Sequence, residues 1–474
     1  MADLKFVQIS PEPLDRFRPL LGDEFEEIEA IAAKARREFA GRAIWHVNST
    51  ARGGGVAELL WALLPYVRGA SVDTRWVVLR EPPEFFALTK RIHNLLHGYP
   101  GDGGDLGEPE RRLYEETLAA SGRQLVELCQ PGDIIYLHDP QTAGLVPVMQ
   151  GAGLTVVWRC HVGVDGPNEN VRKAWDFLRG YVQAADALIF SRRHYAWEGL
   201  DGERIWEMPP VIDPFTTKNQ ELSAAVVEAI LGAIGLGTGP PAGAPVFVRS
   251  DGTPGRVERQ AELLQEEPLP RDAKVVVQVS RWDRLKDPHG VLEMFEKHLR
   301  DPGIHLVLAG PSTVAVADDP EGAAVYRDTA ESWRRMEESA RRRSHLVSLP
   351  MYDIEENGAM VNAIQRRGDV VVQKSLAEGF GLTVVESMWK RRAVVASRVG
   401  GIQDQIGGGT SGLLIDDPRD LEGFGGAVLG LLSDPARAAR FGEAAHQRVI
   451  DRYLAVFRLR EYVLLLASLL NRRE

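Results

Sequence analysis

The stretch "AIWHVNSTARGGGVAELLWALLPYV" (residues 43–67) holds a strand, a glycine-rich turn and a helix in succession. Its first six residues form a short, mostly apolar run, which predicts a strand buried on both faces. After the glycines, apolar side chains recur at the spacing of one helix face, at Val56, Leu59, Leu60, Leu63 and Val67. A buried strand that leads into an amphipathic helix is the repeating unit of an α/β fold with a parallel sheet.

The same unit recurs along the chain. We predict further strands at residues 75–79, 133–139, 155–161 and 187–191, and then at 274–280, 304–310, 369–375 and 393–397. A chain of 474 residues is too long for one core, since cores stop growing at roughly 250–300 residues. The sequence therefore predicts two doubly wound parallel-sheet domains in series, with the break near the prolines of "MPPVIDPFTTKNQ" (208–220).

The composition, with 44% hydrophobic and 26% charged residues, is that of an ordinary soluble globular protein. A net charge of −11 argues against a nucleic-acid partner, because such partners require a basic surface. The amino terminus lacks signal-peptide features and no apolar run approaches the ~18 residues of a membrane span, so we expect a cytoplasmic protein with no membrane association. Cys129 and Cys160 have no CxxC spacing and fit a reducing compartment, and we expect Cys160 to be a buried strand residue.

Gly53, Gly54 and Gly55 lie on the first strand-to-helix turn. Ligands of open parallel sheets bind beyond the carboxyl ends of the strands, and the free N–H groups of a helix start favour an anion there. The spacing is neither GxGxxG nor GxxxxGK[ST], which excludes the dinucleotide and P-loop fingerprints. By itself this glycine cluster is compatible with a phosphate cradle or with a simple tight turn.

A second strand-end loop carries two cations. In "VSRWDRLKDPHGVLEMF" (279–295), Arg281 and Lys286 follow a predicted strand, and Asp287 with Pro288 marks the start of a helix. Together the two cations can neutralise a diphosphate, although two charges on a solvated loop are the alternative reading.

A third strand end, "QKSLAEGFGLTVVESMWKR" (373–391), carries a second glycine turn. Gly379 and Gly381 allow close approach of the backbone to a ligand. Glu378 precedes the turn and Glu386 lies in the following helix, so one carboxylate can bind hydroxyls of a sugar and the other those of a ribose. For Glu386 the alternative is a glutamate that only complements the helix dipole.

The motifs "SRWDRLK" (280–286) and "EGFGLTVVE" (378–386) resemble the donor site of retaining glycosyltransferases with the GT-B fold, the family of sucrose and glycogen synthases. Four further stretches are similar to stretches of the trehalose glycosyltransferring synthases within that family. They are "HVNSTARGGGVAELL", "YLHDPQTAGL", "WRCHVGVDGPN" and "PPVIDPFTTKN". The resemblance implies two Rossmann-like domains facing across a cleft. Residues 1–212, joined by a carboxyl-terminal helix at 455–474, would form the acceptor-side domain, and residues 213–454 the nucleotide-sugar donor domain.

The resemblance also implies roles for single residues. The donor diphosphate would be bound by Arg281 and Lys286 together with the backbone of Phe380, Gly381, Leu382 and Thr383. Glu386 would hold the ribose, Glu378 the transferred glucose, and His161 would contact that glucose near its anomeric carbon. Gly54 and Gly55 would approach the phosphates from the first domain, while Asp139 and Gln141 are candidates for binding the acceptor.

The implied reaction is the reversible transfer of glucose from ADP-, UDP- or GDP-glucose to free glucose, with retention of the anomeric configuration and no cofactor. No Asp-x-Asp occurs in the sequence, so we expect no metal at the diphosphate. A retaining trehalose phosphorylase using glucose 1-phosphate, another retaining hexosyltransferase, a glycosidase acting through Glu378 and Glu386, and a non-catalytic sugar-nucleotide sensor remain alternatives. The sequence leaves open which nucleotide base is preferred and whether the cell uses synthesis or cleavage of trehalose. It also leaves open whether the mechanism is a front-face or a double displacement, and whether the protein is a homodimer.

Overall fold

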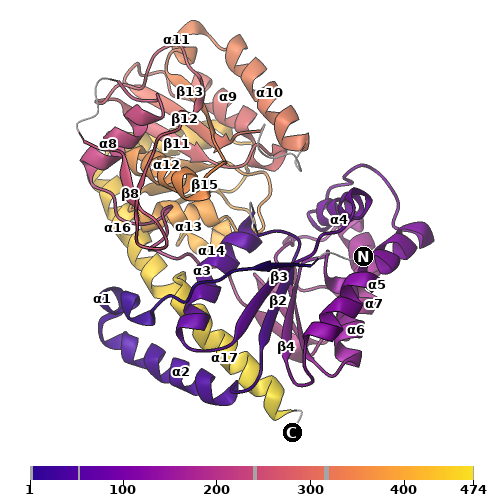
Figure 1. The fold of residues 1–474 in the computed structure, drawn as a ribbon. Coiled ribbons are helices and arrows are strands. Elements are labelled where there is room, and N and C mark those ends of the chain that lie inside the picture. The colour runs from indigo at the N-terminus through magenta and orange to yellow at the C-terminus, as the bar shows by residue number, and fades with distance from the viewer. Residues whose placement is uncertain (1–3, 52–53, 239–242, 314–319, 473–474) are drawn as a thin grey trace. The chain divides into compact units, whose positions relative to one another are not determined.

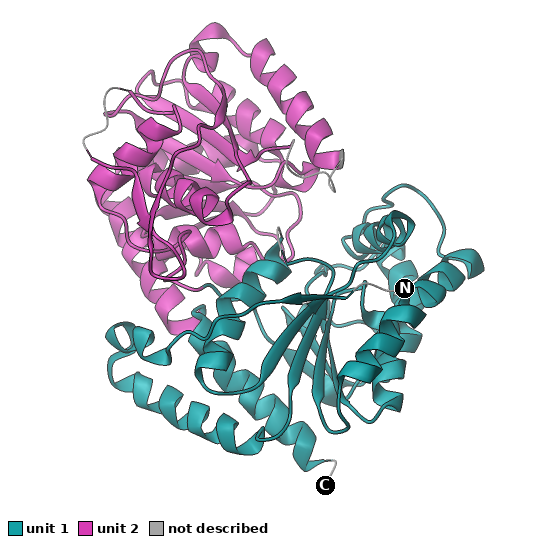
Figure 2. Cartoon of the chain, viewed as in Figure 1, with its two compact units in different colours: residues 1–212, 453–474 teal, residues 213–452 magenta. Residues whose placement is uncertain are grey.

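The computed structural model describes residues 4–51, 54–238, 243–313 and 320–472, and it divides into two compact units (Figure 2). Unit 1 comprises residues 1–212 and 453–474, and unit 2 comprises residues 213–452. The chain thus passes out of unit 1 and returns to it. The N–H of Ile212 donates to the carbonyl of Tyr453 at 2.8 Å and the N–H of Ala455 to that of Ile212 at 3.0 Å, so the exit and the return lie side by side.

Unit 1 is built on a seven-stranded sheet in the order β1-β3-β2-β4-β5-β6-β7. Its neighbouring strands β3, β2 and β4 are labelled in Figure 1. The strands are β1 (Lys5–Val7), β2 (Ile44–Asn48), β3 (Thr74–Val78), β4 (Ile134–His138), β5 (Thr155–Cys160), β6 (Ala187–Phe190) and β7 (Ile205–Glu207). All neighbours pair in parallel except β1, which runs antiparallel to β3 at the edge. Their carboxyl ends therefore share one side of the sheet.

Helices cover both faces of this sheet. They are α1 (Arg18–Leu21), α2 (Phe25–Glu38), α3 (Gly55–Gly69), α4 (Pro83–Leu96), α5 (Glu108–Leu128), α6 (Val146–Gly151), α7 (Glu169–Val182) and α17 (Ala455–Asn471). The larger core packs α4, α5, α6 and α7 against one face of the strands. On the other face, α17 packs against α2 and α3, burying residues such as Leu465 and Leu466.

Unit 2 repeats the design with a seven-stranded sheet in the order β10-β13-β12-β11-β14-β15-β16. These strands are β10 (Glu262–Leu264), β11 (Lys274–Val279), β12 (Ile304–Pro311), β13 (Ser344–Leu349), β14 (Val370–Gln373), β15 (Ala393–Ser397) and β16 (Leu413–Ile415). Only the edge strand β10 is antiparallel to its neighbour. A separate hairpin consists of β8 (Val246–Val248) and β9 (Pro254–Arg256).

The helices of unit 2 are α8 (Ala224–Ala233), α9 (Pro288–His298), α10 (Pro320–Arg335), α11 (Glu338–Arg341), α12 (Ile354–Arg367), α13 (Leu382–Trp389), α14 (Ile402–Gln405), α15 (Leu421–Ser433) and α16 (Pro435–Arg452). A core cluster joins α9, α10 and α15 to the inner strands, with Phe295, Trp333 and Phe424 among its large members. The structure thus has two α/β units with doubly wound, mainly parallel sheets, which confirms the predicted fold class.

Two parts of the strand prediction need correction. The sheets are not parallel throughout, because β1 and β10 are short antiparallel edge strands. The prediction also overlooked β13, a central strand whose sequence "SHLVSL" buries Ser344, His345 and Ser348. Buried polar residues break up the apolar run by which such strands are recognised. Cys160 does lie buried in β5, as expected.

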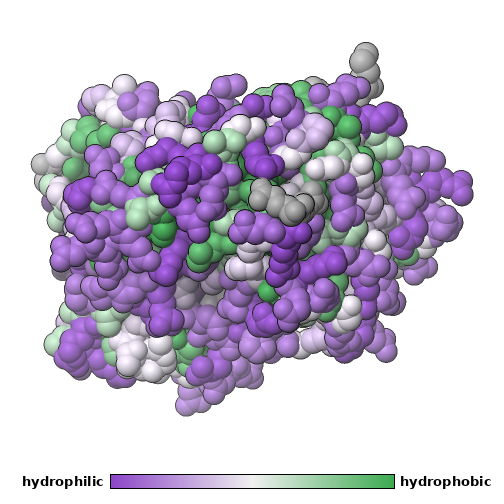
Figure 3. Space-filling model, turned by 90° about the horizontal axis from the view of Figure 1, so that it is seen from below, coloured by the Kyte–Doolittle hydropathy of each residue, from purple (hydrophilic) through white to green (hydrophobic). Residues whose placement is uncertain are grey.

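Hydrophilic residues cover most of the face shown in Figure 3, with hydrophobic residues in small groups between them. Among the described residues, no helix combines the length and the apolar character that a membrane crossing requires.

Candidate active site

The loop after β11 carries Arg281 and Lys286, and local capping fixes its course. Asp283 accepts from the Leu285 N–H and so caps the short 3-10 turn Arg284–Lys286. Asp287 then adopts a left-handed conformation (φ 49°) and caps α9 by accepting from the Gly290 N–H at 3.1 Å. The predicted helix start at Asp287 and Pro288 is therefore confirmed.

Lys286 and Glu378, which stand far apart in the sequence, form an ion pair between this loop and the loop after β14. Their side chains are only 14% and 12% exposed. The Ser375 hydroxyl also contacts the same Glu378 oxygen, at 3.4 Å. A half-buried pair of this kind holds both charged groups in place at the carboxyl end of the sheet.

Further contacts join the two loops. The Leu376 N–H donates to the Leu285 carbonyl at 2.7 Å. The buried Gln278 accepts from the Lys374 N–H at 3.0 Å and donates to the Lys286 carbonyl at 2.9 Å. Lys374 in turn forms an ion pair with Asp287. Gln278 and Lys374 were not predicted from the sequence, because their contacts depend on neighbours across the sheet.

Gly379, Phe380 and Gly381 form the turn that leads into α13. Gly381 is the N-cap of the helix, with a φ of 88° that side-chain-bearing residues rarely adopt. A Cβ at Gly381 would also lie 2.9 Å from the Ile402 side chain. Leu382 and Thr383 begin the helix, and the Thr383 hydroxyl donates to Gln373 at the end of β14. The turn therefore presents backbone rather than side chains beside the strand end.

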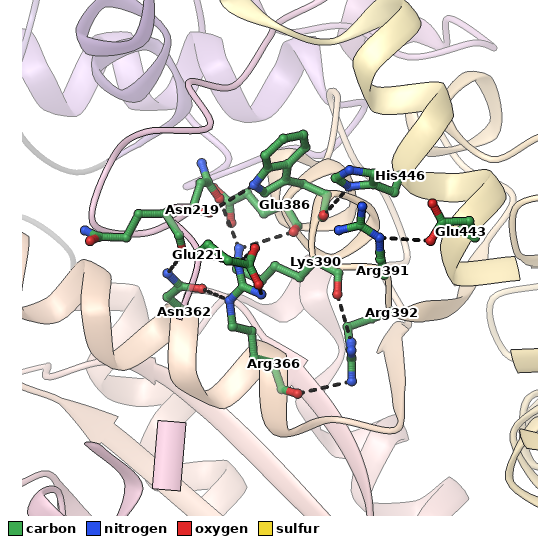
Figure 4. Close-up of polar contacts among 12 residues, drawn as sticks. Asn219, Glu221, Asn362, Arg366, Glu386, Lys390, Arg391, Arg392, Glu443 and His446 are labelled. Carbon is green, nitrogen blue, oxygen red and sulfur yellow. Dashed lines mark hydrogen bonds and ion pairs between the residues drawn. The ribbon is translucent and has the colours of Figure 1, made fainter. Parts of the chain in front are cut away.

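Glu386 lies one helical turn further into α13 and is only 3% exposed. The Lys218 Nζ lies 2.7 Å from its Oε1, while its Oε2 has no hydrogen-bond partner among the described residues. Figure 4 shows Lys390 next to it, where its Nζ donates to Asn219 Oδ1 at 3.0 Å and to the Glu386 carbonyl at 3.2 Å. Burial lowers the pKa of Lys390 well below its usual range. A buried carboxylate with one bare oxygen retains capacity for a further donor.

In unit 1, the glycine turn after β2 leads into α3. Gly54 is the N-cap at φ 100° and Gly55 is the first helical residue. A Cβ on Gly54 would meet no described residue within 4 Å, so the backbone conformation is the reason for a glycine there. Gly53 lies outside the described residues.

His161 and Asp139 meet at the carboxyl ends of β5 and β4. Asp139 has a positive φ of 61°, and its Oδ1 accepts from the His161 backbone N–H at 2.7 Å. Burial raises the pKa of Asp139 to about 7, against the opposing influence of that N–H and of Arg159. Burial, together with the charge of Arg159, lowers the pKa of His161 well below its usual range, so its imidazole is neutral. Gln141, also named as an acceptor candidate, is partly buried next to them in the chain.

The structure thus brings the predicted residues together in pairs. Lys286 contacts Glu378 and Asp139 contacts His161, whereas Arg281 pairs with Asp283 at 3.3 Å and Glu386 pairs with Lys218. Lys218 was not predicted, although it stands in the quoted stretch "PPVIDPFTTKN". Its role becomes visible only when that stretch is seen to pack on α13.

Comparison with known families covers both units. Residues 46–197 match the family described as "Trehalose synthase, N-terminal domain", and residues 259–448 match "Glycosyl transferases group 1". The chain is 33% identical to the trehalose synthase of Pyrococcus horikoshii over 470 residues, which cover 99% of each chain. It is 24% identical to a trehalose phosphorylase of Pleurotus pulmonarius over 431 residues, which cover 85% of this chain and 54% of that one.

Among solved structures, an α,α-trehalose-phosphate synthase (UDP-forming) from Burkholderia vietnamiensis superposes with a TM-score of 0.65. The sequence identity is 16%, and the superposition covers 91% of this chain and 98% of the other. This likeness shows the GT-B fold. Together with the full-length similarity in sequence, it shows that the chain belongs to the trehalose synthase family of glycosyltransferases.

Proposed function

We propose that the protein transfers glucose from a nucleotide-diphosphate glucose to free glucose and forms trehalose reversibly, with retention of the anomeric configuration. The observation that supports a nucleotide donor is the environment of Glu386. Its buried Oε2 lacks a partner among the described residues, and a buried acceptor is normally satisfied. A ribose hydroxyl is a suitable donor, whereas a sugar phosphate without a ribose would leave this oxygen bare.

Arg281 and Lys286 supply the positive charge for the donor diphosphate in this proposal. Stabilising the departing diphosphate is an electrostatic task, and cations fixed before the reaction perform it best. Lys286 is held in place by Glu378, and the N-terminal end of α13 lies at the following turn. The helix dipole there favours a phosphate in the same way.

Glu378 orients the glucose in this proposal and does not attack it. Its carboxylate is engaged by Lys286, which stabilises its negative charge and makes it less nucleophilic. The bond between the anomeric carbon and the phosphate oxygen breaks, and the bond to the acceptor oxygen forms on the same face. The proton of the acceptor hydroxyl passes to the departing phosphate. A glucosyl–Glu378 adduct trapped with a slow substrate would contradict this scheme and support double displacement.

The residues of unit 1 have assigned roles as well. His161 contacts the transferred glucose through its neutral imidazole, and Gly54 and Gly55 approach the phosphates with their backbone. Asp139 already accepts from the His161 N–H, so we assign it first to holding His161 and second, with Gln141, to binding the acceptor.

The test is a panel assay with the purified full-length chain. ADP-, UDP- or GDP-glucose is mixed with glucose, and the disaccharide and its anomeric configuration are identified by NMR. Trehalose from at least one donor supports the proposal. Trehalose made only from glucose 1-phosphate would identify a phosphorylase, and ligand binding without turnover would identify a sensor.

A further inference from the structure

Three histidines form a continuous chain across the sheet of unit 1. The His46 Nδ1 lies 3.1 Å from the His138 Nε2, and the His138 Nδ1 lies 3.1 Å from the His161 Nε2. Each pair of rings is stacked with centroids 5.4 Å apart and planes 23° from each other. The first two histidines are 3% and 1% exposed, so the chain runs from the interior to the strand ends.

The sheet register explains this arrangement. His46 pairs with Tyr136, so His138 stands two residues further along the neighbouring strand. His138 pairs with Arg159, and His161 again stands two residues further. A step of two keeps side chains on the same face of a sheet, so the three imidazoles form a diagonal row on the face covered by α2, α3 and α17.

The rings are neutral. Burial lowers the pKa of His46 to about 3 and that of His138 well below its usual range, and the buried Arg159 beside the row acts in the same direction. The Arg159 guanidinium donates to the Tyr462 hydroxyl and to the Met208 carbonyl. Its positive charge is therefore fixed beside the row.

A neutral imidazole has one donor and one acceptor nitrogen. His138 must therefore donate to one neighbour and accept from the other if both contacts are hydrogen bonds. Only two fully bonded arrangements exist, with the remaining proton on His161 Nδ1 or on His46 Nε2. In either arrangement the state of one ring fixes the state of the other two. The His161 Nδ1, which has no partner among the described residues, is the nitrogen left for a ligand.

Unit 2 contains a comparable pair whose direction is fixed. The His305 Nδ1 lies 3.1 Å from the His345 Nε2, and the His345 Nδ1 lies 3.0 Å from Gln265 Oε1. The amide oxygen can only accept, so His345 donates through Nδ1 and accepts from His305 through Nε2. The group that binds the end of such a row thus decides the direction in which its hydrogen bonds run. In unit 1, the nitrogen at the corresponding end is the His161 Nδ1.

We propose that His138 and His46 are positioning residues that act through His161: His138 occupies its Nε2 and, held in turn by His46, fixes its ring plane, so that only Nδ1 meets the donor sugar. This inference rests on the proposed function, because it assigns the sugar to His161. The imidazole nitrogens that face one another serve as hydrogen-bond partners, and the described residues contain no group of His, Cys, Asp and Glu side chains suited to a metal ion.

The first test needs no substrate. In protein labelled with ¹⁵N-histidine, ring nitrogen shifts distinguish protonated from bare nitrogens, and a His161→Ala sample assigns the His161 signals. We expect His46→Leu to change the ring shifts of His161, although His46 does not touch it. His46→Asn, whose amide can still bond His138, should restore them. The matched control is His305→Leu in unit 2, which should leave the His161 signals unchanged.

The second test is a double-mutant cycle on turnover. We expect His46→Leu to lower kcat about tenfold in the wild-type background, with donor KM changed less. In the His161→Ala background it should lower kcat less than about twofold, because a residue acting through His161 has nothing left to position. Melting temperatures of all four proteins show whether each is folded.

The outcomes distinguish the positioning role of His46 and His138 from the proposed function. Unchanged His161 shifts in His46→Leu, or an equal loss of kcat in both backgrounds, would overturn the positioning role while leaving the proposed function intact. A fully active His161→Ala enzyme would instead overturn the assignment of His161 to the donor sugar. The shift experiment would still report whether the three rings are coupled.

Discussion

Lys218 holds Glu386 by one carboxylate oxygen, with 2.7 Å between Nζ and Oε1, and leaves the other oxygen bare among the described residues. Glu386→Gln keeps the size of the side chain but removes its charge. If Oε2 binds a ribose, we expect the donor KM to rise about 10- to 100-fold, since a hydrogen bond to a charged group contributes about 1.5–3 kcal/mol. Initial rates at varied nucleotide-glucose concentration measure this.

Glu443→Gln provides the control for Glu386. Glu443 on α16 pairs with Arg391 at 2.9 Å on the exposed side of the same region (Figure 4). Its substitution should leave donor KM unchanged. An unchanged KM in Glu386→Gln as well would remove the ribose role and favour a donor without a nucleotide.

Lys286→Met tests the charge that stabilises the leaving group. Removing a fixed charge that acts on the transition state costs about 10²- to 10³-fold in kcat, and the substitution also removes the ion pair between residue 286 and Glu378. Lys297→Met in α9 is the matched control, because Lys297 is exposed and, among the described residues, forms an ion pair only with Glu293 one helical turn away. Loss of melting temperature in parallel with kcat would point to a structural role for Lys286.

Substitutions at Gly54 and Gly55 distinguish an effect on stability from an effect on the proposed phosphate contact. Gly54→Ala places a side chain at φ 100° and should cost about 1–3 kcal/mol of stability. Gly55→Ala lies at the first helical position, where alanine favours the helix by up to about 1 kcal/mol. We therefore expect Gly55→Ala to lower activity without lowering the melting temperature.

The control for Gly55 is Gly430→Ala in α15, where an added Cβ has none of the described atoms within 4 Å. It should change the melting temperature at most slightly and leave activity alone. Full activity of Gly55→Ala would contradict the phosphate contact and indicate that the glycine stretch is only a tight turn.

The raised pKa of Asp139 should make the free energy of unfolding depend on pH. Its pKa of about 7 in the folded protein lies above its ordinary value of 3.8, so between these pH values the folded state binds more protons than the unfolded state. The free energy of unfolding should therefore fall as the pH rises from about 4 to 7. Asp139→Asn removes this effect while preserving the oxygen that accepts from His161, and Asn tolerates a positive φ. The melting temperature of Asp139→Asn relative to wild type should be higher at pH 8 than at pH 5. A difference that does not vary with pH would contradict the raised pKa.

Treatment with EDTA tests whether the cations of the protein suffice at the diphosphate. We expect turnover to survive chelation, since Arg281 and Lys286 can supply the charge that a metal ion would otherwise bring. Loss of activity that Mg²⁺ restores would show that the two cations are insufficient.

The sequence predicted those features of the fold and site that short patterns determine. Apolar runs located most of the inner strands but not β13, whose buried polar residues interrupt the run, and strand ends followed by glycine or by cations pointed to Lys286 and Glu378. The sequence did not predict the contacts of Lys218, Gln278 and Lys374, because their partners lie on distant segments. His46 and His138 escaped for another reason: inside a buried strand, a histidine is indistinguishable from the surrounding core until the register of the neighbouring strands is known.

The return of the chain to unit 1 through α17 has a consequence for biosynthesis. Proteins are made from the amino terminus, and the domain that emerges first usually folds first. Here the face of the first sheet that carries α2 and α3 is also covered by α17, which is synthesised after the whole of unit 2, whereas unit 2 is one uninterrupted segment. Unit 2 therefore has all its residues available before unit 1 does. During synthesis, the sheet of unit 1 keeps an apolar face uncovered until α17 is released.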